Sequence, residues 1–164
     1  MIYLANTSGC VGKSTFVSKF EDAHPGNVMV FDSARSRDQF SMAQDSKEVQ
    51  VVFWVLTRND GEDVDYKSVE SVKDGRFNNI KYHSKRVYLD VHPHCVILSN
   101  KVPEDMSRLT WSRWRLGVIE SKESEIQWYR YSDDGTKIHM PGRLDLLTDH
   151  DDRDEITSGE EDNA

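Results

Sequence analysis

Apolar and polar positions along the chain form blocks that predict an α/β fold. Short apolar runs at residues 1–5, 27–32, 49–56 and 94–100 predict strands. The third run, VQVVFWVL, is rich in β-branched and aromatic residues, which is typical of a strand buried on both faces. Residues 13–23 (KSTFVSKFEDA) have helical composition and follow the first strand after a short loop. Strands that alternate with helices favour a largely parallel sheet.

Further elements continue the same pattern. Residues 65–75 predict a helix, with Val69 and Val72 at helical spacing and Gly75 at its end. Alternating residues at 76–91 predict a hairpin, and residues 113–121 (RWRLGVIES) predict a fifth strand. The stretches 33–48 (SARSRDQFSMAQDSKE) and 102–114 have turn and helix composition. We expect an α/β domain with a largely parallel central sheet and helices on both faces.

The loop after the first strand, in LANTSGCVGKST, is close to a phosphate-binding pattern. The pattern G-x-x-x-x-G-K-[ST] matches Gly12, Lys13 and Ser14, but its first glycine falls on Thr7. Gly9 lies two residues later, so the spacing is altered while the loop stays rich in small residues. A chance GKS in an ordinary strand-turn-helix is the alternative.

This position in the fold has the chemistry of an anion site. A helix N-terminus presents free backbone N–H groups and the positive end of the helix dipole. Gly9 and Gly12 would let the backbone approach phosphates closely, and Lys13 would bring a positive charge to the β- and γ-phosphates. The Ser14 hydroxyl would bind Mg²⁺, with Thr15 as a second hydroxyl. The loop therefore predicts binding of ATP and Mg²⁺.

The net charge of −8 belongs to one end of the 164-residue chain. Residues 145–164 hold nine acidic residues and one arginine, whereas residues 1–144 hold 20 acidic and 20 basic residues. We expect 1–144 to form one domain and 145–164 to be an acidic, disordered tail. The neutral domain leaves nucleic-acid binding open, because any such binding must come from local charge.

Cysteine content and hydropathy predict an intracellular protein. Cys10 lies in the phosphate loop and Cys95 in a predicted strand, which does not suggest a disulfide framework. The sequence has no long apolar run for a membrane span and no basic leader followed by an apolar run. We therefore expect no association with membranes.

Residues 49–120 resemble the superfamily 3 helicase domain of replication-associated proteins from small circular single-stranded DNA viruses. The resemblance rests on motifs in order: VVFWVLTR, DYKSVESVKDG, NNIKYHSKRV, HCVILSNKVPEDMSRLT and SRWRLGVIE. The loop is similar to a longer family variant, G-x-x-G-x-x-G-K-S, with Asn6 in place of the opening glycine. Family members usually carry an N-terminal nicking endonuclease domain, whereas this chain begins at the helicase. We expect a fragment, a separately encoded helicase or a decayed relative.

The resemblance implies a P-loop NTPase of AAA+-like fold that forms a hexamer-type ring on single-stranded DNA or RNA during replication, in the host nucleus or cytoplasm. Asn100 would contact the γ-phosphate or orient a water, although an asparagine at a strand end also caps turns. Arg113, or Arg115, would be an arginine finger toward a neighbouring subunit, or else would stack on Trp114.

A basic hairpin is the third feature that the resemblance implies. Lys81, Lys85 and Arg86, with Tyr82 and His83 between them, would follow a phosphate backbone and stack on a base. An ordinary solvated strand pair is the alternative.

One family position is altered. The acid that should follow VVF, which would hold Mg²⁺ through water, is replaced by Trp54. Asp32 or Asp60 could substitute as the metal-binding acid, and hydrolysis could be slow or absent. Two other function classes therefore stay open. One is a nucleotide-binding interaction module that does not hydrolyse, and the other is a P-loop kinase of small molecules, which VFDSAR at residues 30–35 suggests.

Overall fold

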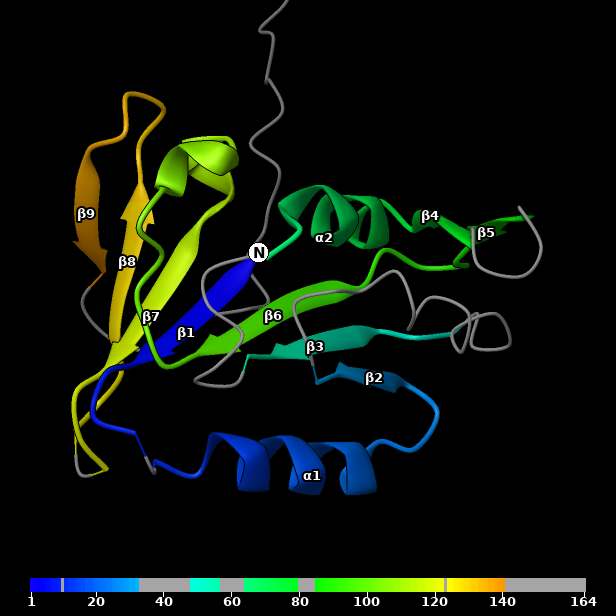
Figure 1. The fold of residues 1–164 in the computed structure, drawn as a ribbon, viewed down its shortest axis with the longest axis horizontal. Helices are drawn as coiled ribbons and strands as arrows, with labels where there is room; N and C mark the ends of the chain where they lie inside the picture. The colour runs from blue at the N-terminus through cyan, green and yellow to red at the C-terminus, as the bar shows by residue number, and fades with distance from the viewer. Residues whose placement is uncertain (10, 33–47, 57–63, 80–84, 123, 141–164) are drawn as a thin grey trace, which may run out of the picture.

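The computed structural model describes residues 1–9, 11–32, 48–56, 64–79, 85–122 and 124–140. A seven-stranded sheet in the order β2-β3-β6-β1-β7-β8-β9 forms the centre of this part of the chain (Figure 1). The first five strands of that order pair in parallel, and β8 and β9 pair antiparallel at one edge. The strands are β1 (Ile2–Asn6), β2 (Val28–Phe31), β3 (Val51–Val55), β6 (His94–Ser99), β7 (Arg115–Ile119), β8 (Gln127–Tyr131) and β9 (Lys137–Met140).

Two helices cover opposite faces of the sheet, as Figure 1 shows. Helix α1 (Lys13–Ala23) buries Val17 against alternate strand residues that include Phe53 and Leu98. Helix α2 (Tyr66–Lys73) buries Val69 against the intervening set, in which Trp54 and Ile97 are almost fully buried. Since successive strand residues point to opposite faces, a sheet covered on both sides needs the continuous apolar runs seen in the sequence. The predicted α/β class is therefore confirmed.

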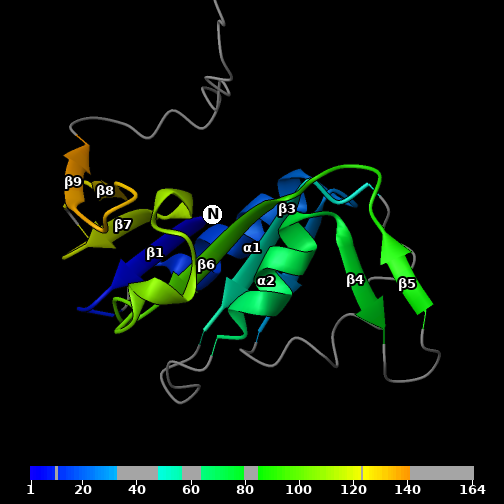
Figure 2. The same cartoon turned by 90° about the horizontal axis from the view of Figure 1, so that it is seen from above.

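A two-stranded ribbon connects α2 to β6. Strands β4 (Arg76–Asn79) and β5 (Lys85–Tyr88) pair antiparallel, as predicted for residues 76–91. The ribbon projects beside the end of α2, separate from the main sheet (Figure 2). Gly75 makes the turn into it with a φ of +67°, and its carbonyl accepts a hydrogen bond from the Leu89 amide at 2.8 Å.

The chain between β6 and β7 crosses the face that α2 also covers. It forms two 3₁₀ turns, η3 (Met106–Arg108) and η4 (Trp111–Arg113), before Trp114 enters the core fully buried. The Trp114 indole donates to the Met106 carbonyl at 2.9 Å, which anchors the crossover. The turn and helical character predicted for 102–114 is thus confirmed as 3₁₀ structure.

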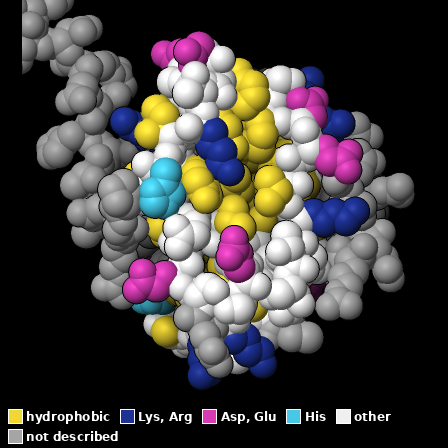
Figure 3. Space-filling model, turned by 90° about the vertical axis from the view of Figure 1, so that its left-hand side faces the viewer, with side chains coloured by type: hydrophobic (Ala, Val, Ile, Leu, Met, Phe, Trp, Pro, Cys, Tyr) yellow, Lys and Arg dark blue, Asp and Glu magenta, His cyan; other side chains and the backbone are white. Residues whose placement is uncertain are grey.

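Strands β8 and β9 extend the sheet beyond the elements predicted from the sequence. β8 joins the sheet by pairing with β7, and the two strands pack closely at Gly117, where an added Cβ would lie 2.6 Å from Leu4 Cδ2 and 2.9 Å from Trp128 Cζ3. The Trp128 ring thus fills the space that a side chain at residue 117 would need. Figure 3 views this edge of the molecule, where apolar side chains gather near the centre around a basic side chain, and other charged side chains lie toward the rim.

Several predictions fall outside the described residues. They are the turn and helix at 33–48, apart from its last residue, and the acidic tail at 145–164. The division at residue 144 also lies beyond the last described residue, Met140, and it stays a prediction.

Candidate phosphate-binding site

The loop after β1 lies where two neighbouring strands send the chain to opposite faces of the sheet. From β1 the chain passes into α1 on one face, and from β6, its direct neighbour, it passes into the crossover on the other face. In open α/β sheets, ligands bind in the crevice that such diverging connections leave at the carboxyl ends of the strands. The predicted loop therefore lies at the carboxyl edge of the sheet, beside β1 and β6, where ligands bind in folds of this class.

The loop backbone has the shape that its glycines allow. Gly9 and Gly12 have φ values of 71° and 86°, in the left-handed region that other residues rarely adopt. An added Cβ at Gly12 would meet nothing within 4 Å, so the backbone angle and not crowding favours glycine there. The same open space lies at the N-terminus of α1, where a bound anion would sit.

The N-terminus of α1 has no side-chain cap among the described residues. Gly12 occupies the cap position, and the first turn contains no acidic residue. In α2, by contrast, Asp65 accepts hydrogen bonds from the backbone N–H and the hydroxyl of Ser68. Ser14 and Thr15 are exposed in the first turn of α1. An anion would supply the acceptors that a capping side chain supplies in α2.

Lys13 and Asn100 meet at this helix end. The Lys13 ammonium donates to Asn100 Oδ1 at 2.7 Å, which joins the start of α1 to the residue that follows β6. Both side chains are half-buried. These two residues were predicted from separate motifs, and the fold brings them into direct contact.

Asn6 is a buried polar residue at the base of the loop. Its side chain is fully buried, and its Nδ2 donates to the Ile119 carbonyl at 2.8 Å and to Ser8 Oγ at 3.2 Å. Among the described residues its Oδ1 has no hydrogen-bond partner. The sequence placed Asn6 at the opening position of the loop but assigned it no role, and the signal for one is a polar residue at the end of an apolar strand.

The predicted metal-binding residues are not brought together. Asp32 follows β2 and is exposed, and β3 and β6 separate β2 from β1, a span of roughly 14 Å at the usual strand spacing. Asp60 lies outside the described residues. Within the described part of the chain, no group of three His, Cys, Asp or Glu side chains could hold a metal ion. Of the predicted ligands, Ser14 alone is seen beside the loop.

Trp54 occupies the position where the resembled family has its acid, and its ring lies in the apolar core. It is 1% exposed and packs edge-on against Phe31 at a centroid distance of 5.3 Å, on the face covered by α2. A carboxylate at this position would therefore be buried among apolar side chains instead of facing the loop.

Arg113 lies at the opposite end of β1 from the loop. Its guanidinium forms an ion pair with Glu70 of α2 at 2.5 Å, and its carbonyl accepts a hydrogen bond from the amino group of Met1. The alternative, Arg115, donates to the carbonyls of Ser112 and Trp114. Neither arginine joins Lys13 within one molecule, and the predicted role toward a neighbouring subunit stays a prediction.

The basic hairpin lies at the amino-terminal edge of the parallel strands, away from the loop (Figures 1 and 2). Lys85 and Arg86 belong to β5, and Lys81 lies outside the described residues. Residues 76–88 contain four Lys or Arg and no acidic residue, in a chain whose net charge is −8. Tyr88, which the sequence analysis did not single out, is 59% exposed and lies opposite Arg76 in the ribbon.

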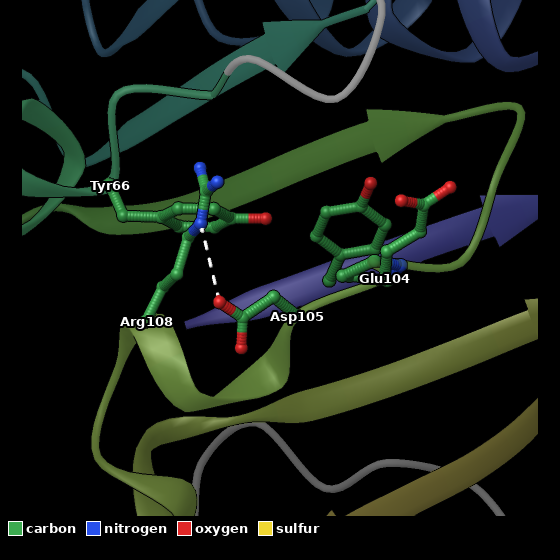
Figure 4. A pocket seen from close by; sticks show the side chains of 6 residues that line it. Tyr66, Glu104, Asp105 and Arg108 are labelled. Carbon is green, nitrogen blue, oxygen red and sulfur yellow. Dashed lines mark ion pairs between the residues drawn. The ribbon is translucent and has the colours of Figure 1, made fainter.

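A small pocket on the α2 face is separate from the phosphate loop. It has a volume of about 80 Å³ and is lined by Tyr3, Tyr66, Pro103, Glu104, Asp105 and Arg108. In Figure 4 the Arg108 guanidinium lies beside the Tyr66 ring. The Asp105 carboxylate forms an ion pair with this guanidinium at 3.6 Å. Hydrogen bonds from Ser107 lower the pKa of the Asp105 carboxyl. Since ligand pockets usually measure about 300–1,000 Å³, this pocket is too small for a nucleotide.

Comparison with known proteins adds no family, since no family model matches the chain and no curated protein matches it. Among the helices of the described residues, none has the length and apolar character needed to cross a membrane. Geometry and local chemistry therefore carry the functional assignment.

Proposed function

We propose that this chain is a nucleoside triphosphate-binding domain of P-loop type, with an AAA+-like fold, that holds the phosphates of ATP at the N-terminus of α1. The observation that carries the proposal is the 2.7 Å hydrogen bond between Lys13 and Asn100 beside an uncapped helix end. This pair lies at the edge and between the strands where open α/β sheets bind ligands.

Each part of the site has a chemical role in this proposal. Gly9 and Gly12 bend the backbone so that its N–H groups turn toward the phosphate oxygens. Lys13 neutralises charge on the β- and γ-phosphates, and the exposed Ser14 hydroxyl is positioned to take a place in the coordination shell of Mg²⁺. Asn100, at the end of β6, orients the terminal phosphate or a water molecule beside it. The bound Mg²⁺ would supply further charge neutralisation.

The helicase assignment is the further step of the proposal, and two observations support it. The motifs of the superfamily 3 helicase domain occur in the same order along the chain, and the segment between α2 and β6 forms the expected projecting hairpin. Residues 76–88 contain four basic residues, and Tyr88 of the ribbon is exposed, a combination that suits a single strand of DNA or RNA. A ring of several copies would bring the Arg113 edge of one copy toward the loop of the next.

A second candidate function is a nucleotide-binding module that does not hydrolyse ATP. The burial of Trp54 in the core favours it, because the family position for a metal-binding acid is then unavailable. Among the described residues, no group of three His, Cys, Asp or Glu side chains could hold a metal ion. Measurable hydrolysis of ATP, even if slow, would instead favour the helicase.

Phosphate release from ATP, measured with and without single-stranded DNA or RNA, separates these functions. A helicase-type domain should bind a fluorescent ATP analogue and release phosphate faster when a strand is present. A module should bind the analogue without turnover. A small-molecule kinase should show no phosphate release that depends on the strand, because it transfers the γ-phosphoryl group to an acceptor hydroxyl and not to water. The Lys13→Ala variant should bind the analogue weakly in every case, and equal binding by this variant and the wild type would overturn the P-loop proposal.

A further inference from the structure

A buried acceptor without a partner needs an explanation, and Asn6 Oδ1 is such an acceptor. Burial of an unsatisfied polar atom is unfavourable, and native structures contain few of them. Both donors of the carboxamide are in use, since Nδ2 bonds Ile119 O at 2.8 Å and Ser8 Oγ at 3.2 Å. Turning the amide over to exchange its nitrogen and oxygen would break the bond to Ile119 O, because two carbonyl oxygens would then face each other. The oxygen is therefore held in place while no described residue donates to it.

The pairing of β1 with β6 places Asn6 beside Asn100. Ala5 pairs with Ser99, so the next residue of each chain segment is Asn6 in β1 and Asn100 just after β6. Neighbouring strands are about 4.8 Å apart. Two asparagines thus stand side by side at the carboxyl edge, and the Lys13 ammonium already contacts one of them at 2.7 Å.

We propose that Asn6 is a positioning residue for the phosphate loop, and that its Oδ1 accepts a second hydrogen bond from the Lys13 ammonium when an oxyanion occupies the loop. The inference rests on the proposed function. An ammonium group has three N–H donors. In the occupied site one would contact Asn100, one Asn6 and one a phosphate oxygen.

Such an arrangement explains why an asparagine replaces the glycine that opens the resembled loop. A glycine at residue 6 would remove the acceptor that Asn6 offers to Lys13 at this edge. Asn6 adds a second acceptor from the neighbouring strand, and its Nδ2 ties the loop to β7 through Ile119. The two amide oxygens would hold the ammonium between β1 and β6, where the phosphate arrives.

A double-mutant cycle on the full chain tests this inference, with a fluorescent ATP analogue as the probe. We expect Asn6→Ala and Asn100→Ala each to weaken binding roughly 10-fold, as for hydrogen bonds to a charged group. Because both oxygens would position one ammonium, the double variant should fall short of the product of the single effects by at least about 3-fold. The matched control combines Lys19→Ala, which removes an exposed lysine of α1, with Asn100→Ala, and the two effects should multiply to within about 2-fold.

The outcomes separate this inference from the proposed function. Binding that is unchanged in Asn6→Ala, or effects of Asn6 and Asn100 that multiply, would overturn the positioning role even if Lys13→Ala abolishes binding. Equal binding by wild type and Lys13→Ala would overturn the proposed function itself. Asn6→Gly replaces Asn6→Ala if the alanine variant does not fold. On the wild-type chain, the Asn6 carboxamide signals in NMR should shift on saturation with the analogue, and unmoved signals would also count against the inference.

Discussion

Lys13 and Asn100 are 87 residues apart in sequence, and a 2.7 Å hydrogen bond joins their side chains. Lys13 begins α1 and Asn100 follows β6, the strand next to β1. The bond spans the point where the chain leaves two parallel strands toward opposite faces of the sheet. A ligand bound at Lys13 would therefore act on the ends of both elements at once, and β6 connects this end to the ribbon at its other end.

Replacing Lys13 by alanine should weaken binding of an ATP analogue roughly 10- to 100-fold, because hydrogen bonds to charged groups contribute about 1.5–3 kcal/mol. Fluorescence titration measures the change. The control is Lys19→Ala, which removes an exposed lysine of the same helix and should leave the affinity unchanged. An equal loss in both variants would show that general charge, not the loop, governs binding.

Removing two lysines of the basic hairpin, Lys81→Ala with Lys85→Ala, should weaken binding to a single strand. The plot of log affinity against log salt should flatten by roughly 1.4, since each phosphate contact contributes about 0.7 for single strands. The affinity for ATP should not change. The matched control, Lys19→Ala with Lys67→Ala, removes the same charge elsewhere and should keep the wild-type slope.

Deleting residues 145–164 tests the acidic tail. The deletion removes a net charge of −8 that competes with nucleic acid for the hairpin, so binding to a single strand should become tighter. The gain should be largest at low salt, where screening is weakest. An unchanged affinity at every salt concentration would show that the tail does not compete.

The Trp54→Asp variant should be destabilised instead of gaining hydrolysis. Its ring fills the core beside Phe31, and loss of a large buried aromatic side chain costs about 3–5 kcal/mol before the buried charge is added. Denaturant unfolding should show this loss. Trp54→Phe keeps an apolar ring and should lose much less. A stable Trp54→Asp variant with raised turnover would mean that this position faces the nucleotide.

A methyl group at Gly117 should destabilise the protein by about 1–3 kcal/mol through overpacking. Its Cβ would lie 2.6 Å from Leu4 and 2.9 Å from both Ile126 and Trp128. Thermal unfolding of Gly117→Ala measures the cost. A double variant that also carries Leu4→Ala makes room for the methyl group and should show a smaller additional loss from the glycine substitution. Equal losses in both backgrounds would contradict the packing at this point.

Cys95 should make the stability of the fold depend on alkaline pH. Burial raises the pKa of its thiol from 9.0 to about 12. Below pH 9 the thiol is neutral in the folded and unfolded states, and its contribution is fully present. Between pH 9 and 12 only the unfolded thiol ionises, so stability falls by up to about 1.4 kcal/mol per pH unit. Cys95→Ala should show a shallower decline in denaturant midpoint over this range, and identical profiles would contradict the burial.

The local sequence determined the order and type of most elements. Apolar runs predicted five strands, and helical composition predicted α1 over 13–23, which is where it lies. Strands β8 and β9 were missed because QWYRY and KIHM are short and mix aromatic with charged residues. A strand near the edge of a sheet can expose one of its faces to solvent, and the outermost strand has a neighbour on one side only. Such a strand needs no continuous apolar run.

Tertiary structure decided which predicted residues share a site. The glycines, Lys13 and Ser14 are neighbours in sequence, so a local pattern could find them. Asn100 could be matched to Lys13 only through the pairing of β1 with β6, and Asp32 was separated from the loop by the same strand order. Strand order and register arise from burial over the whole sheet, and a sequence pattern records which face a residue prefers but not which strand lies beside it.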